Sequence, residues 1–111
     1  MKKTTVYLID DELELVEWLS DVVELAGLHA QGYTNARNFF DQIEIFESNS
    51  ILVLDLNMPE MDGIEVMRRL AKMTSPPSLI LISGHDTGVL HSAEKLGNAH
   101  NLKIIASLVK P

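Results

Sequence analysis

Residues 51–63 of this chain read ILVLDLNMPEMDG, an apolar run that ends in Asp55 and passes into a turn. A short apolar run bounded by turn residues predicts a buried β-strand, so Asp55 would present its carboxylate at the strand's carboxyl end. Three further apolar runs end in polar residues, namely Asp10 with Asp11, Ser83, and Lys110 with Pro111. Four strand ends therefore offer acids, a hydroxyl and an ammonium, a set that can receive and hold a phosphoryl group.

Apolar segments alternate with segments of helical periodicity along the chain. The pattern predicts strands at 4–10, 28–33, 51–55, 78–82 and 103–109, and helices at 12–26, 35–46, 62–73 and about 86–98. Gly27 is the expected stop of the first helix. Strands that are apolar on both faces and alternate with helices predict an α/β fold, with a parallel sheet covered on both sides. Such sheets bind ligands at the carboxyl ends of their strands, where the polar residues above fall.

Length and composition exclude several classes of function. The 111 residues, 46% of them hydrophobic, fit one domain over residues 1–111. No apolar stretch approaches the roughly 20 residues that span a bilayer, and the start does not resemble a signal peptide, so we expect a cytoplasmic protein with no membrane contact. The absence of cysteine excludes disulfides and thiolate chemistry. A net charge of −7 argues against direct binding of nucleic acid.

The predicted strand ends would gather the carboxylates of Asp10, Asp11 and Asp55 in one cleft. Three carboxylates repel one another unless a cation lies among them, and Mg²⁺ suits the site because it prefers oxygen ligands. With part of the charge neutralised, Asp55 can attack a phosphorus atom and carry it as an acyl phosphate.

Three more residues would complete this phosphoryl site. Lys110 would balance the phosphoryl oxygens from the opposite side, and the Ser83 hydroxyl would donate to one of them. Gly84 would leave room for the group and offer a free backbone amide. Each residue has a plainer interpretation, since acids, serines and glycines at strand ends are usually turn or cap residues. Their occurrence together at four strand ends favours the functional interpretation.

Other polar residues give weaker signals. Asp62 precedes a helical run with an acid three residues later, so we interpret it as a helix cap. The four histidines lack a compact metal-binding spacing; they are His29, His85, His91 and His100. His85 follows the predicted phosphoryl site and, together with Asn57, could tune the loss of phosphate, although a surface-loop histidine is the plainer interpretation.

Together these motifs resemble the response-regulator receiver domain of two-component phosphorelay signalling, over essentially the whole chain. The matching positions are Asp10-Asp11, Asp55 with Asn57, Pro59 and Gly63, then Ser83, and Lys110-Pro111. The resemblance implies a flavodoxin-like, doubly wound, five-stranded parallel sheet in the strand order 2-1-3-4-5. It also implies that a sensor histidine kinase or a phosphotransfer protein supplies the phosphoryl group.

The same resemblance implies roles for individual residues. Asp55 would be the phosphoacceptor, and Mg²⁺ would be ligated by Asp11, Asp55 and the backbone carbonyl of Asn57, with Asp10 acting directly or through water. Such a domain is not an enzyme in the ordinary sense, because transfer and hydrolysis take place on its own aspartate.

On the same basis, Lys110 would contact the acyl phosphate. Ser83, beside Gly84, would follow the phosphoryl group as a switch hydroxyl and move the surface around the fourth helix and the fifth strand. A fused or separate output domain would read that change.

Two departures from the family pattern concern this switch. Ser107 occupies the place, three before Lys110, where receivers usually carry an aromatic ring, so we expect backbone displacement to replace ring rotation. Ser83 and Lys110 are 110 − 83 = 27 positions apart, which predicts an enlarged fourth helix or following loop, either as a partner surface or as a tolerated insertion. The long segment resembles receivers fused to cyclic-di-GMP phosphodiesterase domains of the EAL type.

A third departure is the C-terminus, since receivers continue past the Lys-Pro pair into a fifth helix. We expect the chain to be a fragment that lacks this helix and any output domain. Apolar groups such as Ile105 and Val109 would then lie partly uncovered and favour self-association, for example as a homodimer.

Two alternatives remain open from the residues alone. A phosphatase of the haloacid-dehalogenase type also combines an Asp nucleophile with Mg²⁺, but it needs a second acid at the position of Asn57, and an amide cannot carry a proton. A degenerate receiver that serves only as a docking module is the other, and the intact set of acids, Ser83 and Lys110 argues against it.

Overall fold

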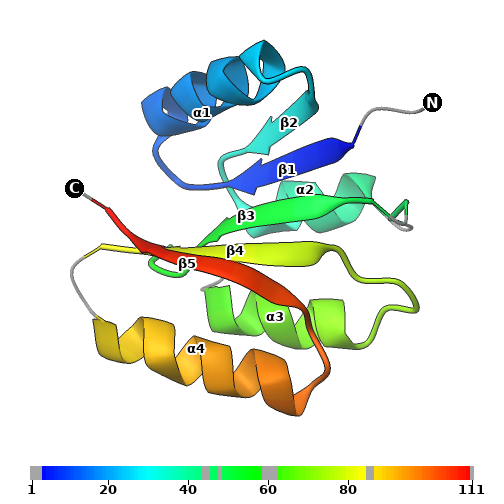
Figure 1. The fold of residues 1–111 in the computed structure, drawn as a ribbon, viewed down its shortest axis with the longest axis vertical. Coiled ribbons are helices and arrows are strands. Elements are labelled where there is room, and N and C mark those ends of the chain that lie inside the picture. Colours follow the sequence, from blue (N-terminus) through cyan, green and yellow to red (C-terminus); the bar gives the residue numbers. More distant parts are fainter. Residues whose placement is uncertain (1–3, 44–45, 48, 59–62, 85–86, 111) are drawn as a thin grey trace.

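The structure, a computed structural model, describes residues 4–43, 46–47, 49–58, 63–84 and 87–110. Its strands are β1 (Thr5–Ile9), β2 (His29–Tyr33), β3 (Ile51–Asp55), β4 (Ser78–Ser83) and β5 (Ile104–Val109). Its helices are α1 (Leu13–Leu25), α2 (Ala36–Gln42), α3 (Gly63–Ala71) and α4 (Thr87–Ala99). All neighbouring strands pair in parallel, in the order β2-β1-β3-β4-β5 (Figure 1). The predicted α/β class and strand order are therefore confirmed.

The helix predicted over residues 35–46 is the largest error in the element boundaries. The helix α2 begins after Asn35, whose side-chain oxygen accepts a hydrogen bond from Asn38 N at 2.8 Å, and it ends at Gln42. Phe46 lies outside the helix and is buried against Tyr7, with ring centroids 5.4 Å apart. Phe46 therefore contributes to the core from outside the helix. Its apolar side chain continued the helical pattern in the sequence past the real end of α2.

The sheet separates two packing layers. The main core joins alternate residues of β1, β3 and β4 to α2, α3 and α4; its members include Tyr7, Ile9, Phe39, Leu52, Leu54, Val66, Met67, Leu79, Leu81 and Leu90. The helix α1 packs on β1 and β2 from the other side, where Val6 and Leu8 of β1 are buried. Figure 1 shows α1 across the strands from α3 and α4. Gly27 has a φ of 87° and ends α1, as predicted.

The start of α3 is held against the segment that follows β3. Gly63 is buried, and its N–H donates to Leu56 O at 3.4 Å. A Cβ atom at Gly63 would lie 2.7 Å from Leu56 Cα, a separation that real Cβ atoms do not adopt. The absence of a side chain at Gly63 therefore lets the start of α3 pack directly against Leu56, the residue that follows Asp55.

Part of β5 is uncovered, as we expected from the sequence. Ile105 and Val109 are each 46% exposed and Leu108 is 53% exposed. On α1, Trp18 is 61% exposed and lies on the surface of the helix. The fifth helix, the fragment and the homodimer stay predictions. Within the described parts of the chain, no helix is long and apolar enough to cross a membrane.

The first prediction concerns Gly63. Replacing it with alanine forces a Cβ into the Leu56 backbone, so Gly63→Ala should lower the free energy of unfolding by about 1–3 kcal/mol. Chemical denaturation measures the loss. Gly84→Ala is the matched control, because a Cβ there meets no atom of the described residues within 4 Å. Equal stability of the two variants would contradict the close packing of α3 on this segment.

Candidate functional site

The polar residues predicted at the strand ends meet at one edge of the sheet. Asp10 follows β1, Asp55 ends β3, Ser83 ends β4 and Lys110 follows β5. Backbone hydrogen bonds carry the pairing of the strands into this edge: Leu56 N donates to Ile82 O at 2.9 Å, and Lys110 N donates to Ser83 O at 2.7 Å. The parallel sheet thereby brings together residues that are up to 100 positions apart.

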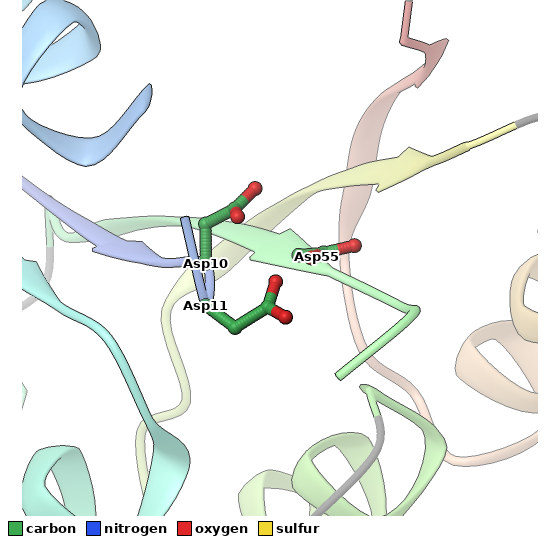
Figure 2. A group of neighbouring side chains, drawn as sticks. All are labelled: Asp10, Asp11 and Asp55. Carbon is green, nitrogen blue, oxygen red and sulfur yellow. The ribbon is translucent and has the colours of Figure 1, made fainter. Parts of the chain in front are cut away.

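Three carboxylates form the centre of the site. Asp10, Asp11 and Asp55 each offer an oxygen atom, and these atoms lie within 4.8 Å of one another (Figure 2). Asp10 and Asp55 are 3% and 1% exposed, whereas Asp11 is exposed. No other such group of acids, histidines or cysteines occurs among the described residues.

The donor set fits a magnesium ion. All three candidate ligands are carboxylate oxygens, which hard divalent cations prefer. Asp10 Oδ2 is buried, and the Lys110 ammonium lies 3.1 Å from it, so this oxygen already faces one positive charge and could also face a cation. The backbone carbonyl of Asn57 belongs to the predicted ligand set, and its role stays a prediction.

Lys110 supplies a positive charge beside the acids. Its Nζ atom lies 3.1 Å from Asp10 Oδ2, 3.5 Å from Asp55 Oδ2 and 3.4 Å from Glu12 Oε1. The contact with Asp10 is an ion pair without hydrogen-bond alignment. Glu12 was not singled out from the sequence. Its place directly after the Asp10-Asp11 pair was the available signal, but an exposed acid at a helix start looks like an ordinary dipole partner.

Burial dominates the ionisation of Asp55. It raises the pKa of Asp55 from 3.8 to about 6; the hydrogen bond from Asn57 N and the charge of Lys110 lower it, and the other two carboxylates of the group raise it. Burial alone would lower the pKa of Lys110, but its contact with Asp10 and the charges of Asp55 and Glu12 outweigh burial and raise the pKa. At neutral pH and above, Asp55 is therefore mostly an anion beside a firmly protonated ammonium.

The side chain of Asn57 joins the two loops that follow β3 and β4. Its Oδ1 atom accepts hydrogen bonds from Ser83 Oγ at 3.1 Å and from Gly84 N at 3.2 Å. The backbone N–H of Asn57 donates to Asp55 Oδ1 at 3.0 Å. The expectation of a free amide at Gly84 was therefore wrong, because the Asn57 amide can turn toward it. The expected room at Gly84 is present, since a Cβ there meets no described atom within 4 Å.

Four other predicted features remain: Ser107, Asp62, His85 and the fourth helix. Ser107 lies in β5, and its Oγ atom is buried with no hydrogen-bond partner among the described residues. Asp62 and His85 lie outside the described residues, so the cap and the dephosphorylation role stay predictions. The helix α4 covers Thr87–Ala99, close to its predicted bounds.

A family model for the response regulator receiver domain matches residues 6–106. The chain belongs to this family. The receiver is 41% identical to a response regulator of Colwellia psychrerythraea, with a TM-score of 0.85 over 99% of this chain and 86% of the other. It also superposes on FixJ-N with 28% identity and a TM-score of 0.79, over 100% of this chain and 84% of the other.

Curated relatives extend beyond the region that this receiver matches. The response regulator TmoT of Ectopseudomonas mendocina is 33% identical over 84 residues, which are 76% of this chain and 38% of TmoT. The transcriptional regulator FixJ of Bradyrhizobium diazoefficiens is 31% identical over 96 residues, 86% of this chain and 46% of FixJ. The receiver thus spans less than half of either relative. The kinship with receivers fused to EAL-type phosphodiesterases stays a prediction.

The second prediction uses the raised pKa of Asp55. The folded receiver binds the Asp55 proton more tightly than the unfolded chain does, so this contribution to stability is complete below pH about 4 and is lost as the pH rises through about 6. In metal-free buffer, Asp55→Asn should therefore raise the unfolding free energy at pH 7.5 by up to about 3 kcal/mol. The gain should shrink toward zero as the pH falls from 6 to 4.

Urea denaturation in EDTA at a series of pH values measures this difference. Asp21→Asn, which removes an exposed acid of α1, controls for the loss of one negative charge. A gain for Asp55→Asn that does not change between pH 7.5 and pH 4.5 would contradict burial as the cause of the raised pKa.

Proposed function

We propose that this receiver accepts a phosphoryl group on Asp55 in a reaction that requires Mg²⁺. The observation that carries the proposal is the position of Asp55, a buried carboxylate at a strand end that lies within 4.8 Å of two further acids and 3.5 Å from Lys110. Burial disfavours the charged form of this carboxylate and raises its pKa to about 6, and strongly perturbed acids of this kind cluster at functional sites.

The donor would be a phosphohistidine of a sensor histidine kinase or a phosphotransfer protein. An oxygen of Asp55 attacks the phosphorus atom, and the phosphorus–nitrogen bond of the donor breaks in line with the new bond. The bonding electrons leave with the imidazole nitrogen, which takes up a proton. Attack of water on the same phosphorus would later release inorganic phosphate and restore the Asp55 carboxylate.

The residues around Asp55 support this chemistry. Asp11, Asp55 and the Asn57 carbonyl, with Asp10 acting directly or through water, would hold Mg²⁺. When bound, the ion neutralises part of the negative charge that the carboxylates and the phosphoryl oxygens bring together. The Lys110 ammonium lies 3.5 Å from Asp55 Oδ2 and would stabilise the transferred group electrostatically. Asp55 is mostly ionised at neutral pH, as a nucleophile must be.

The consequence of phosphorylation would be a change at the loop after β4 and at the surface of α4 and β5. Ser83 and Gly84 have donors that can turn to a phosphoryl oxygen. A response regulator receives its phosphoryl group from a kinase and acts through an output domain. We propose a kinase partner and an output domain for this receiver, and a location in the cytoplasm. The relative FixJ is named a transcriptional regulatory protein.

The third prediction tests the acceptor. Incubation of the 111-residue chain with Mg²⁺ and acetyl phosphate should give one adduct of a single phosphoryl group by intact mass. Asp55→Asn should abolish the adduct, because an amide is a poor nucleophile, whereas Asp21→Asn should keep it.

Other outcomes separate the alternatives. A folded chain that binds Mg²⁺ and is never phosphorylated, even by its kinase, would support a docking module and overturn the proposal. Continuous release of phosphate with many turnovers per minute would support a phosphatase.

The fourth prediction tests the metal site without phosphate. Excess Mg²⁺ should raise the melting temperature of the wild-type receiver, because it binds the folded chain only. Asp11→Asn should weaken this Mg²⁺ binding on the order of tenfold, and Asp21→Asn should leave it unchanged. The Lys110 contacts given above are with Asp10, Glu12 and Asp55, so replacing Asp11 leaves them in place. Equal Mg²⁺ affinity in Asp11→Asn and wild type would remove Asp11 from the ligand set.

A further inference from the structure

The side chain of Asn57 holds the two donors that a phosphoryl group would need. Ser83 Oγ donates to Asn57 Oδ1 at 3.1 Å and Gly84 N donates to the same atom at 3.2 Å. Because a backbone N–H can only donate, the atom that faces Gly84 must be the amide oxygen rather than the amide nitrogen. One acceptor thus binds a side chain and a backbone group 26 and 27 positions away.

Asn57 is at the same time tied to the phosphoacceptor. Its backbone N–H donates to Asp55 Oδ1 at 3.0 Å, and the residue between them, Leu56, donates its N–H to Ile82 O at 2.9 Å. The backbone of this segment is therefore held by β4 and by the Asp55 carboxylate. The Asn57 side chain, on an exposed residue, is the part that can turn away without breaking the sheet.

We propose that the Asn57 side-chain amide is a latch that holds Ser83 and Gly84 in the unphosphorylated arrangement and that a phosphoryl group on Asp55 must displace it. The inference rests on the proposed function. A hydroxyl and a backbone amide have one hydrogen each, so neither group can donate fully to Asn57 Oδ1 and to a phosphoryl oxygen at once.

The hydrogen bonds of the latch stabilise the unphosphorylated arrangement of Ser83 and Gly84. Ser83 is 0% exposed, so its hydroxyl needs a partner when no phosphoryl group is present, and Asn57 supplies one. A charged phosphoryl oxygen is a stronger acceptor than a neutral amide, so the exchange goes forward on phosphorylation. The two bonds that must break reduce the net gain and keep the loop after β4 from switching spontaneously.

The side chain and the backbone of Asn57 thus act separately. The backbone carbonyl is the predicted metal ligand, and side-chain substitutions leave it in place. Asn57 is a positioning residue, because its amide acts on phosphorylation through Ser83 and Gly84. A purely structural amide would change the stability of the receiver but would not change its affinity for a phosphoryl group in a way that depends on Ser83.

The fifth prediction measures that affinity with fluoroberyllate, which mimics a phosphoryl group on a carboxylate, in excess Mg²⁺. Titration calorimetry of the 111-residue chain should give roughly five- to tenfold tighter binding for Asn57→Ala than for wild type, the order expected when one to two neutral hydrogen bonds need not be broken. In a Ser83→Ala background the same substitution should gain only about two- to threefold, because the Gly84 bond alone remains.

A second readout reports the latch directly. In phosphate-free protein, Asn57→Ala should shift the Gly84 amide resonance, while Asn57→Asp, which keeps an acceptor oxygen, should leave that amide hydrogen-bonded. With fluoroberyllate bound, the Gly84 resonances of wild type and Asn57→Ala should converge, because the mimic then accepts the bond in both.

The outcomes separate the latch from the function beneath it. If fluoroberyllate binds wild type but not Asp55→Asn, and Asn57→Ala binds it no more tightly, the latch is wrong and the acceptor function stands. If fluoroberyllate binds neither wild type nor Asp55→Asn, the acceptor function fails and the latch fails with it. A gain of equal size with and without Ser83 would also overturn the latch.

Discussion

The ion pair of Lys110 with Asp10 and Asp55 is the interaction on which the site depends. It joins the chain after β5 to the ends of β1 and β3, over distances of 3.1 and 3.5 Å. Two carboxylates with 3% and 1% exposure would repel each other strongly without that ammonium. The sheet order is what makes the pair achievable, since β1 and β3 are neighbours and β5 follows β4 at the edge.

The same edge of the sheet connects charge to movement. Asp10, Asp11 and Lys110 interact electrostatically with Asp55. Hydrogen bonds from Ser83 and Gly84 to Asn57 link this site to the loop that follows β4. One hydrogen bond connects these two networks, because the backbone N–H of Asn57 donates to Asp55 Oδ1. A new group on Asp55 would therefore act on both networks at once. Ser107 offers no aromatic ring, so in the proposed function the hydrogen bonds of Asn57 would connect Asp55 to the loop after β4.

Sequence patterns succeeded where one physical effect dominated. The strands β1, β3 and β4 were predictable because their burial makes them nearly continuous apolar runs, and the positions of Asp10, Asp55 and Ser83 at their ends followed from that. The helix α2 was predicted too long because Phe46 is apolar for a tertiary reason, its packing on Tyr7. Glu12 was overlooked because an exposed acid has no signature until Lys110 lies beside it.

The α/β class, the family resemblance and the set of polar groups at the strand ends could be read from the residues alone, because these depend on local periodicity and on the order of residue types along the chain. Tertiary structure decided which of these groups touch. The contacts of Lys110 with Glu12, the burial that raises the pKa of Asp55 and the capture of the Gly84 amide by Asn57 all depend on side chains from distant segments. The distances between these side chains and their burial arise only when the strands assemble into the sheet, and no local pattern encodes them.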